Sequence, residues 1–290
     1  MSKLALLLLL FRYRLPYRVP GMWRLSLWLA RGLEAQPVVI ENQFSLYADL
    51  RSLPESPLRL LLSSQDYESG EQALFRQLLR PRDVAYDIGA NLGLFVALFA
   101  ALVGPRGRVV AFEPNPRLCV NLRRTVAGIP FAQLHECALA KEPGELTFFV
   151  PDDPMMGSLA DWSGQATEQV RCQVKVLDEM VKNTASPDLL KIDTEGAEFL
   201  VLQGATAILA DPERAPIVFF EQIPKAAAAF GYAPESAQRL LRQFEWMSFY
   251  HVDEDGSLTS LPEEYAGAGN LLAVPAARRS RLEGVRIHAA

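Results

Sequence analysis

The stretch that decides the fold is DIGANLGL, residues 87–94. It follows a short apolar run at residues 84–86 and opens a longer apolar segment that ends at Gly104 and Pro105. An apolar run, a glycine-bearing turn and a segment stopped by Gly and Pro predict a strand, a tight turn and a helix. Glycines in such a turn also let a ligand approach the backbone, because no Cβ is in the way.

The same alternation continues to residue 274 and predicts the fold class. Strands are expected at residues 84–88, 108–112, 133–137, 189–192, 217–220, 246–252 and 270–274, the last two as an antiparallel pair. Helices are expected at residues 71–79, 92–103, 117–126, 197–209 and 234–244, and two further strands at 145–150 and 168–176. This pattern predicts a Rossmann-like α/β fold, with a mostly parallel seven-stranded sheet, helices on both faces and ligands at the carboxyl ends of the strands.

Two carboxylates near the turn indicate the kind of ligand. Asp87 stands two residues before the first glycine, and Glu113 ends the next apolar run. A carboxylate at the second position can accept hydrogen bonds from both hydroxyls of a ribose. One at the first position would repel a pyrophosphate but attract a cationic ligand with an amino group. These charges favour S-adenosylmethionine over a nicotinamide dinucleotide, whose usual Gly-x-Gly-x-x-Gly turn is replaced here by Gly89-x-x-x-Gly93.

A second group of acids follows the apolar run at residues 189–192. Asp193, Glu195 and Glu198 lie within six residues, and Glu221 ends the next apolar run. Capping of a helix start by an acid accounts for Glu198. Asp193 and Glu221, at the ends of adjacent strands, are expected to position or deprotonate a hydroxyl. A divalent ion between them is left open but not expected.

Three segments together resemble the FkbM-type S-adenosylmethionine-dependent methyltransferases: DIGANLG (87–93), AFEPNP (111–116) and KIDTEGAE (191–198). The resemblance covers roughly residues 65–275. It implies a class I methyltransferase fold and an enzyme that O-methylates a hydroxyl of a sugar, glycolipid or polyketide. The chain departs from the family in its Arg- and Trp-bearing N-terminus, and at residues 152–158, where an acceptor loop is expected.

The residues and the resemblance together predict a set of roles. Asp193 is expected to orient or deprotonate the acceptor hydroxyl, supported by Glu195 and Glu221, with His135 and His251 as alternative bases. The other site residues are expected to bind the cofactor. Its methionine part is assigned to Asp87, Gly89, Asn91 and Gly93, and its ribose to Glu113, with Pro114 next to it. Its adenine is assigned to Cys137 and Ala138, and Glu68 is expected to complete a lid over the cofactor.

Charge and cysteine content narrow the class of protein. The net charge is −5, but the first 34 residues carry six basic side chains against one acid. Without the +5 of this segment the remainder is about −10, which argues against a nucleic-acid-binding face on the main domain. Three widely spaced cysteines indicate reduced thiols in an intracellular protein.

Three parts are expected along the chain: an N-terminal extension of helix and short strands packed on the core (1–64), a methyltransferase domain (65–276) and a basic C-terminal tail (277–290). The apolar run at residues 4–11 is shorter than the ~20 residues that span a bilayer, and no signal cleavage site follows it. We expect it to dock on the domain; the alternative is peripheral contact of residues 1–35 with an anionic membrane. The expected location is therefore cytoplasmic, with membrane association left open.

Two functions of other classes remain open at this point. One is an NAD-dependent oxidoreductase on the same Rossmann-like sheet, disfavoured by Asp87 and by the glycine spacing. The other is a non-catalytic methyltransferase-like binding module, disfavoured by the intact acids Glu113 and Asp193. The acceptor is expected to be a small molecule or a glycan, and the oligomeric state does not follow from the sequence.

Overall fold

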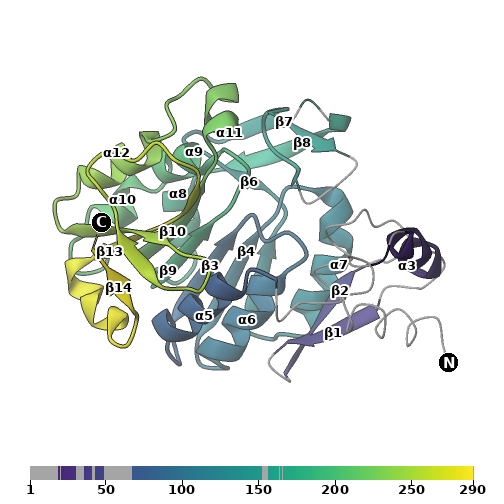
Figure 1. The fold of residues 1–290 in the computed structure, drawn as a ribbon, viewed down its shortest axis with the longest axis horizontal. Helices are drawn as coiled ribbons and strands as arrows, with labels where there is room; N and C mark the ends of the chain where they lie inside the picture. Colours follow the sequence, from purple (N-terminus) through teal and green to yellow (C-terminus); the bar gives the residue numbers. More distant parts are fainter. Residues whose placement is uncertain are drawn as a thin grey trace.

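The computed structural model describes residues 19, 21–30, 36–40, 43–48, 67–151, 156–162, 164 and 166–289 of the 290-residue chain. Among these residues, nine strands form the main sheet in the order β14-β12-β11-β13-β10-β9-β3-β4-β5 (Figure 1). Their bounds are β3 Val84–Ile88, β4 Arg108–Phe112, β5 Ala132–His135, β9 Leu189–Ile192, β10 Ile217–Gln222, β11 Met247–Val252, β12 Leu258–Ser260, β13 Gly269–Pro275 and β14 Ile287–His288.

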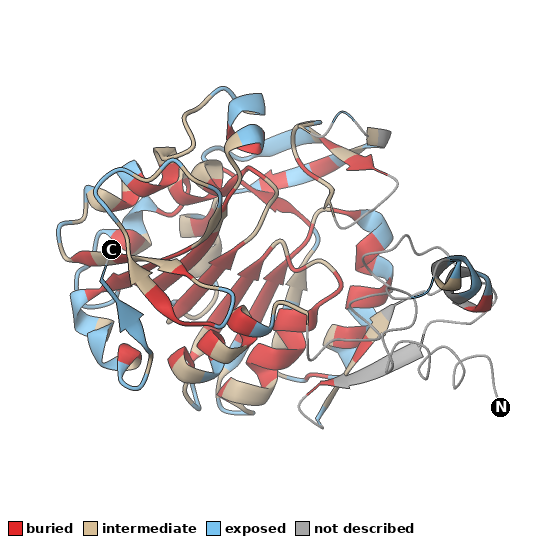
Figure 2. Ribbon diagram, in the orientation of Figure 1, coloured by how far each residue is buried: buried red, intermediate tan, exposed pale blue. Residues whose placement is uncertain are grey.

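The strands β5, β4, β3, β9 and β10 are parallel, and β13 runs antiparallel to both β10 and β11. This confirms the predicted fold class, with all seven expected strands in one sheet. The short strands β12 and β14 extend the sheet beyond seven, and neither was expected. Figure 2 shows the central strands buried between the two helical layers.

Alternate residues of each central strand pack into two different cores. Ala85 and Val109 belong to a core with helices α5 (Ser69–Leu78), α6 (Leu94–Val103) and α7 (Pro116–Ala127). Tyr86 and Val110 belong to the opposite core, with α8 (Leu177–Lys182), α9 (Glu198–Gln203), α10 (Thr206–Leu209) and α12 (Ser236–Arg242). Because successive side chains of a strand point to opposite faces, both faces of a buried strand must be apolar.

One expected helix is divided in the structure, and another is preceded by a helix that was not expected. The helix expected at residues 197–209 is broken at Gly204 into α9 and α10. A Cβ on Gly204 would lie 2.4 Å from the carbonyl oxygen of Ala140, so the chain approaches another segment closely there. The helix expected from Pro234 begins at Ser236, and a separate helix, α11 (Pro224–Ala229), precedes it.

A smaller sheet lies beyond the carboxyl ends of the parallel strands, at the top of Figure 1. Its strands are β6 (Ala138–Leu139), β8 (Ala166–Lys175) and β7 (Gly144–Pro151), and β7 and β8 form an antiparallel pair. The two strands expected on either side of the 152–164 loop are therefore present. Phe148 and Val150 on β7 are buried and turn this sheet's apolar face toward the domain.

The described residues of the N-terminal extension are helix α3 (Met22–Ala30) and the antiparallel hairpin of β1 (Gln36–Ile40) and β2 (Phe44–Ala48). Leu46 and Ile40 are buried in the core shared with α6 and α7, and the backbone N–H of Tyr47 donates to Thr125 Oγ1 at 3.1 Å. Residues 4–11, expected to be helical, lie outside the described residues. No helix in the described ranges is long and apolar enough to cross a bilayer.

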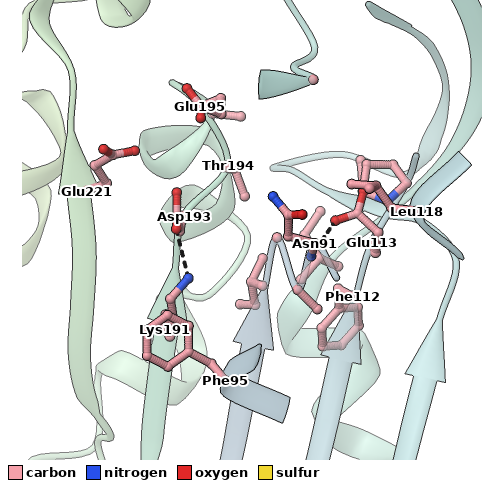
Figure 3. Close-up of a pocket in the computed structure, with 18 of the residues that line it drawn as sticks. Asn91, Phe95, Phe112, Glu113, Leu118, Lys191, Asp193, Thr194, Glu195 and Glu221 are labelled. Atoms are coloured by element: carbon pink, nitrogen blue, oxygen red, sulfur yellow. Dashed lines mark hydrogen bonds and ion pairs between the residues drawn. The ribbon is translucent and has the colours of Figure 1, made fainter. Parts of the chain in front are cut away.

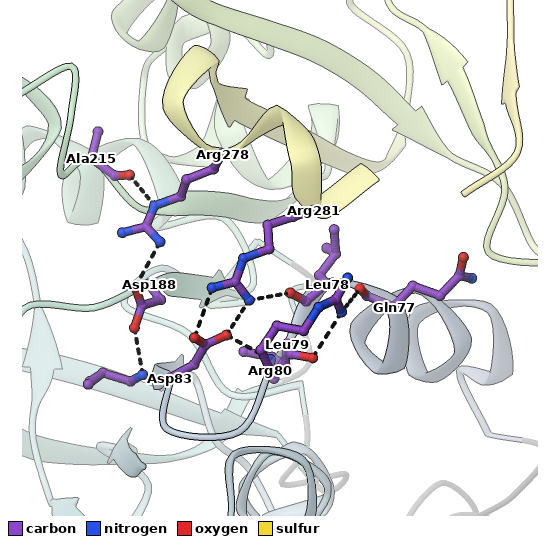
Figure 4. Close-up of polar contacts among 10 residues, drawn as sticks. Gln77, Leu78, Leu79, Arg80, Asp83, Asp188, Ala215, Arg278 and Arg281 are labelled. Carbon is purple, nitrogen blue, oxygen red and sulfur yellow. Dashed lines mark hydrogen bonds and ion pairs between the residues drawn. The ribbon is translucent and has the colours of Figure 1, made fainter. Parts of the chain in front are cut away.

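The C-terminal residues pack near the amino ends of the parallel strands, opposite their carboxyl ends (Figure 4). Two arginines of the 3₁₀ helix η2 (Ala276–Leu282) pair with acids that precede strands β3 and β9. Arg281 forms two hydrogen bonds to Asp83, at 2.6 and 2.9 Å, and Arg278 forms one to Asp188, at 2.7 Å. The segment for which the sequence predicts a basic tail is thereby attached to the domain, and β14 completes the sheet.

Candidate active site

A cleft of about 270 Å³ opens at the carboxyl ends of β3, β4, β9 and β10 (Figure 3). Its walls come from the turn after β3, the end of β4, the residues at β6, the segment after β7, the segment after β9, the end of β10 and the residues before α5. It brings together most of the site residues predicted from the sequence: Glu68, Gly89, Asn91, Glu113, Pro114, Ala138, Asp193, Glu195 and Glu221. Two predicted cofactor residues, Asp87 and Gly93, do not line it.

The turn after β3 is shaped by close contacts within the protein. Gly89 has a φ of +84°, and a Cβ there would lie 1.8 Å from the carbonyl oxygen of Asp193. Gly93 has a φ of +91°, and a Cβ there would lie 2.7 Å from Leu122 of α7. The glycines were expected to make room for a ligand. The structure shows that they also let the turn pack on the end of β9 and on α7, and that Gly89 lines the cleft.

Glu113 is held at the end of β4 by two backbone donors. Its Oε2 accepts a hydrogen bond from the N–H of Asn91 and its Oε1 one from the N–H of Asn115, both at 2.8 Å. The side chain is 4% exposed, and this burial raises its pKa to about 7, although the two donors act in the opposite direction. Each carboxylate oxygen has a second lone pair, so an oriented acceptor remains for a ligand in the cleft.

Asp87 lies beneath the cleft rather than on its surface. Its side chain is 1% exposed, and neither oxygen has a hydrogen-bond partner among the described residues. The nearest cation is Nζ of Lys191, 3.8 Å from Oδ1. Burial raises the pKa of Asp87 to about 7, while Lys191 lowers it. Asp87 was expected to bind the methionine part of the cofactor, but it does not line the cleft, because this strand position points into the layer of α6 and faces Lys191.

Lys191 is the site residue that the sequence analysis missed. Its side chain is 3% exposed, and Nζ lies 2.8 Å from Asp193 Oδ2 and 4.7 Å from the centre of the Phe95 ring (Figure 3). Burial alone would lower its pKa, but Asp193, Asp87 and Glu68 together raise it above the ordinary value. The available signal was a single lysine inside an apolar strand, where a charge needs a partner.

The acids predicted to act on a hydroxyl meet above β9 and β10. The Asp193 side chain is 31% exposed, and Glu221 follows on the adjacent strand, one residue beyond the pair Phe220 and Ile192. Burial, together with Asp193 and Glu195, raises the pKa of Glu221 well above its ordinary value. This shift favours the protonated form of Glu221.

Glu198 begins α9, where an acid was expected to cap the helix, but its hydrogen bonds join it to the preceding loop. Its Oε1 accepts hydrogen bonds from the N–H groups of Thr194 and Gly196, at 2.8 and 3.1 Å, and from the Thr194 hydroxyl at 3.0 Å. The side chain is buried and does not line the cleft. It shapes the loop that carries Asp193 and Glu195.

Backbone strain is concentrated at this cleft. Four non-glycine residues of the described chain have a left-handed φ, and three of them, Glu68, Asn91 and Glu195, line it. Such conformations cost of order 1–3 kcal/mol each and persist where the surrounding structure enforces them, often at functional sites. At Glu68, burial and the charge of Asp193 also raise the pKa to about 7.

Neither histidine proposed as an alternative base reaches the cleft. His135 stacks on Phe112 with ring centres 5.1 Å apart, and burial lowers its pKa. Nδ1 of His251 lies 3.1 Å from Asp253 Oδ1, away from the lining residues.

Cys137 and Ala138, expected beside the adenine, do line the cleft, and all three cysteines are free and buried. Within the described ranges, no group of three or more His, Cys, Asp or Glu side chains is placed to hold a metal ion.

The sheet order and the cleft at its carboxyl edge define a class I methyltransferase fold. Residues 87–246 match the model of the methyltransferase FkbM domain, which is more than half of the chain. The protein therefore belongs to the FkbM methyltransferase family.

Three named relatives are similar over part of their length. Methyltransferase 1 of Beauveria bassiana is 30% identical over 141 residues, covering 41% of this chain and 56% of the relative. The 31-O-demethyl-FK506 methyltransferase FkbM of Streptomyces tacrolimicus is 33% identical over 166 residues, covering 43% and 60%. The hexuronic acid methyltransferase AglP of Haloferax volcanii is 30% identical over 154 residues, covering 48% and 58%. The chain thus spans less than two thirds of each of these relatives.

Proposed function

We propose that this protein is an S-adenosylmethionine-dependent O-methyltransferase that methylates a hydroxyl of a sugar, glycolipid or polyketide-type metabolite. The observation that carries the proposal is one cleft with two kinds of carboxylate. Glu113 is oriented by backbone donors on one side, and Asp193 and Glu221 stand together on the other. Family membership supports the reaction, and relatives named for 31-O-demethyl-FK506 and for hexuronic acid support the acceptor class.

The cleft residues suit S-adenosylmethionine chemically. Glu113 offers acceptors for a ribose diol, and Phe112, Leu118 and Phe148 offer apolar walls for an adenine. The acids of the cleft outnumber its single lysine, which favours a ligand that carries a sulfonium and an ammonium. When bound, this cofactor supplies an activated methyl group and a neutral thioether leaving group.

For the methionine part, we infer a contribution from the turn after β3. Gly89 and Asn91 are lining residues. Asp87 would act from beneath them as a buried negative charge, and Gly93 would act by holding the turn on α7. Pro114 and Ala138 extend the wall next to Glu113, and Glu68 closes the cleft from the start of α5.

Asp193 is the group we assign to the acceptor. An alcohol must lose its proton as its oxygen forms the new C–O bond, so a carboxylate in the cleft increases the rate. The partly exposed carboxylate of Asp193 would accept that proton, and Glu221 and Glu195 would hold the acceptor and share the proton afterwards. Placement and exclusion of water supply the rest of the rate, since the methyl donor is already activated.

Calorimetric titration tests the cofactor assignment. S-adenosylhomocysteine should bind with a stoichiometry of about one, and NADH should not bind. Binding of NADH alone would support the oxidoreductase alternative. Binding of S-adenosylhomocysteine without methyl transfer to any hydroxyl in a cell extract would support the non-catalytic module.

We also propose that α3 contacts an anionic membrane surface, with the protein otherwise in the cytoplasm. Leu29 of this helix is buried in the domain, whereas Leu25 is 39% and Trp28 58% exposed, beside the exposed Arg24. Exposed apolar side chains next to basic ones suit the headgroup region of anionic lipids. The protein should float with phosphatidylserine-containing vesicles, and Trp28→Ala should weaken this, whereas Val120→Ala should not. Equal recovery of both variants would refute the contact.

A further inference from the structure

Lys191 occupies an unusual place in the sheet. The other residues of β9, Leu189, Leu190 and Ile192, are apolar and buried. Lys191 carries a charge, but its side chain is buried as well, at 3% exposure. Desolvation of an unpaired ammonium is costly, so a lysine is retained there only with compensating charges. Those charges are carboxylates: Asp193 at 2.8 Å and Asp87 at 3.8 Å.

The strand register explains why these groups meet. Lys191 is the partner of Asp87 across the parallel pair of β9 and β3. Asp193 is two residues further along the chain, so its side chain leaves on the same side of the sheet. The ring of Phe95, 4.7 Å from Nζ, lies against the ammonium and limits its movement. The lysine is therefore fixed between an acid below the cleft and an acid in it.

We propose that Lys191 is a positioning residue for methyl transfer: its ammonium orients the Asp193 carboxylate toward the cleft and offsets the negative charge of the carboxylates around it. This rests on the proposed function, in which Asp193 receives the proton of the acceptor hydroxyl. Lys191 itself touches neither the acceptor nor the proton in this scheme.

The charges around Asp193 give the lysine this importance. The other ionisable groups that face it are all acids: Glu68 before α5, Asp87 on β3, Glu113 after β4, Glu221 on β10 and Glu195 in its own loop. Each of these, when ionised, repels the charge of the Asp193 carboxylate. Of the described residues that line the cleft, Lys191 alone is basic, so it alone opposes them.

The test is the pH profile of kcat at saturating cofactor and acceptor. Lys191→Met should move the acidic limb of the profile upward by one pH unit or more, with activity partly recovered at high pH. Lys191→Arg should keep the limb within about 0.3 unit of the wild type. A uniform loss of kcat without a shift would mean that the lysine has a structural role only, and would overturn the proposal.

A second variant gives a shift of opposite sign and does not depend on removing the lysine. Asp87→Asn removes one negative charge near Asp193 and one competitor for the ammonium, so the acidic limb should move to lower pH. An unmoved limb in this variant also contradicts the proposal, and it decides the matter if Lys191→Met fails to fold.

The double variant separates this proposal from the proposed function. If Lys191 acts through Asp193, then Lys191→Met should reduce kcat less than twofold further in the Asp193→Asn background. Additive losses would overturn the role of Lys191 while leaving Asp193 as the base. Normal turnover by Asp193→Asn alone would instead overturn the part of the proposed function in which Asp193 is the base. Calorimetry with S-adenosylhomocysteine on each variant checks that the cofactor affinity is unchanged; a loss confined to that affinity would also refute the proposal.

Discussion

A Cβ placed on Gly89 would lie 1.8 Å from the carbonyl oxygen of Asp193. The turn that begins the cofactor side of the cleft and the loop that carries the acceptor side are thus in direct backbone contact. The two halves of the proposed site are positioned by the same contact between β3 and β9. A change at Gly89 should affect both halves.

We expect Gly89→Ala to lower both the affinity for S-adenosylhomocysteine and the free energy of unfolding. The overlap with Asp193 and the φ of +84° both oppose a side chain, and the left-handed conformation alone costs roughly 1–2 kcal/mol. The measurements are calorimetry and urea denaturation. The matched control is Gly144→Ala, where the added Cβ meets nothing within 4 Å. Equal stability of the two variants would contradict the close contact.

Glu113→Ala should weaken S-adenosylhomocysteine binding at least tenfold, or by about 1.4 kcal/mol. The substitution removes the proposed ribose acceptor and leaves the N–H groups of Asn91 and Asn115 without their carboxylate. Calorimetry measures the loss, with Glu145→Ala on the exposed surface as the control. An affinity within twofold of the wild type would remove the ribose assignment.

The buried acid Glu113 should also make the unliganded protein less stable as pH rises. A carboxyl whose pKa is raised from 4.5 to about 7 in the folded state binds protons there more tightly than in the unfolded state. Its stabilisation is complete below pH 4.5 and is lost as pH rises through 7, by about 3 kcal/mol in all. The free energy of unfolding, compared at pH 5 and pH 8, should therefore fall more in the wild type than in Glu113→Gln. Parallel pH curves would show that burial does not shift this pKa.

Arg281→Ala should reduce stability and leave cofactor affinity unchanged. Arg281 makes a two-point contact with Asp83 at the edge of the sheet away from the cleft, and both side chains are largely buried. Leaving that carboxylate without its partner should cost about 1–3 kcal/mol in urea denaturation. Arg286→Ala, which breaks the exposed pair with Asp255, should change stability much less, because solvent screens that pair. Similar losses in the two variants would mean that η2 is not an important attachment.

The acids at the strand ends of the candidate site were predictable from the sequence. Glu113 and Asp193 each follow an apolar strand, and parallel strands bring their carboxyl ends to one edge. Their presence in one cleft follows from that pattern. The position of Glu198 in the first turn of a helix was predictable, since an acid there complements the helix dipole, but its hydrogen bonds to the loop at Thr194 and Gly196 were not.

Features that depend on contacts between distant segments were not predictable. The direction of Asp87 follows from its register with Lys191 on β9, which periodicity does not reveal. The break at Gly204 follows from the approach of Ala140, and the attachment of η2 from acids about 90 and 200 residues earlier. Strands β12 and β14 are too short to produce a recognisable alternation.

The most direct test of the account is transfer of a labelled methyl group from S-adenosylmethionine to hydroxyl-bearing glycans and polyketide-type metabolites, comparing the wild type with Asp193→Asn. The account predicts an alkali-stable methyl ether formed by the wild type, and turnover reduced at least a hundredfold in the variant, with cofactor binding retained. Equal turnover by the two proteins, or label found only on nitrogen or carboxylate groups, would contradict it.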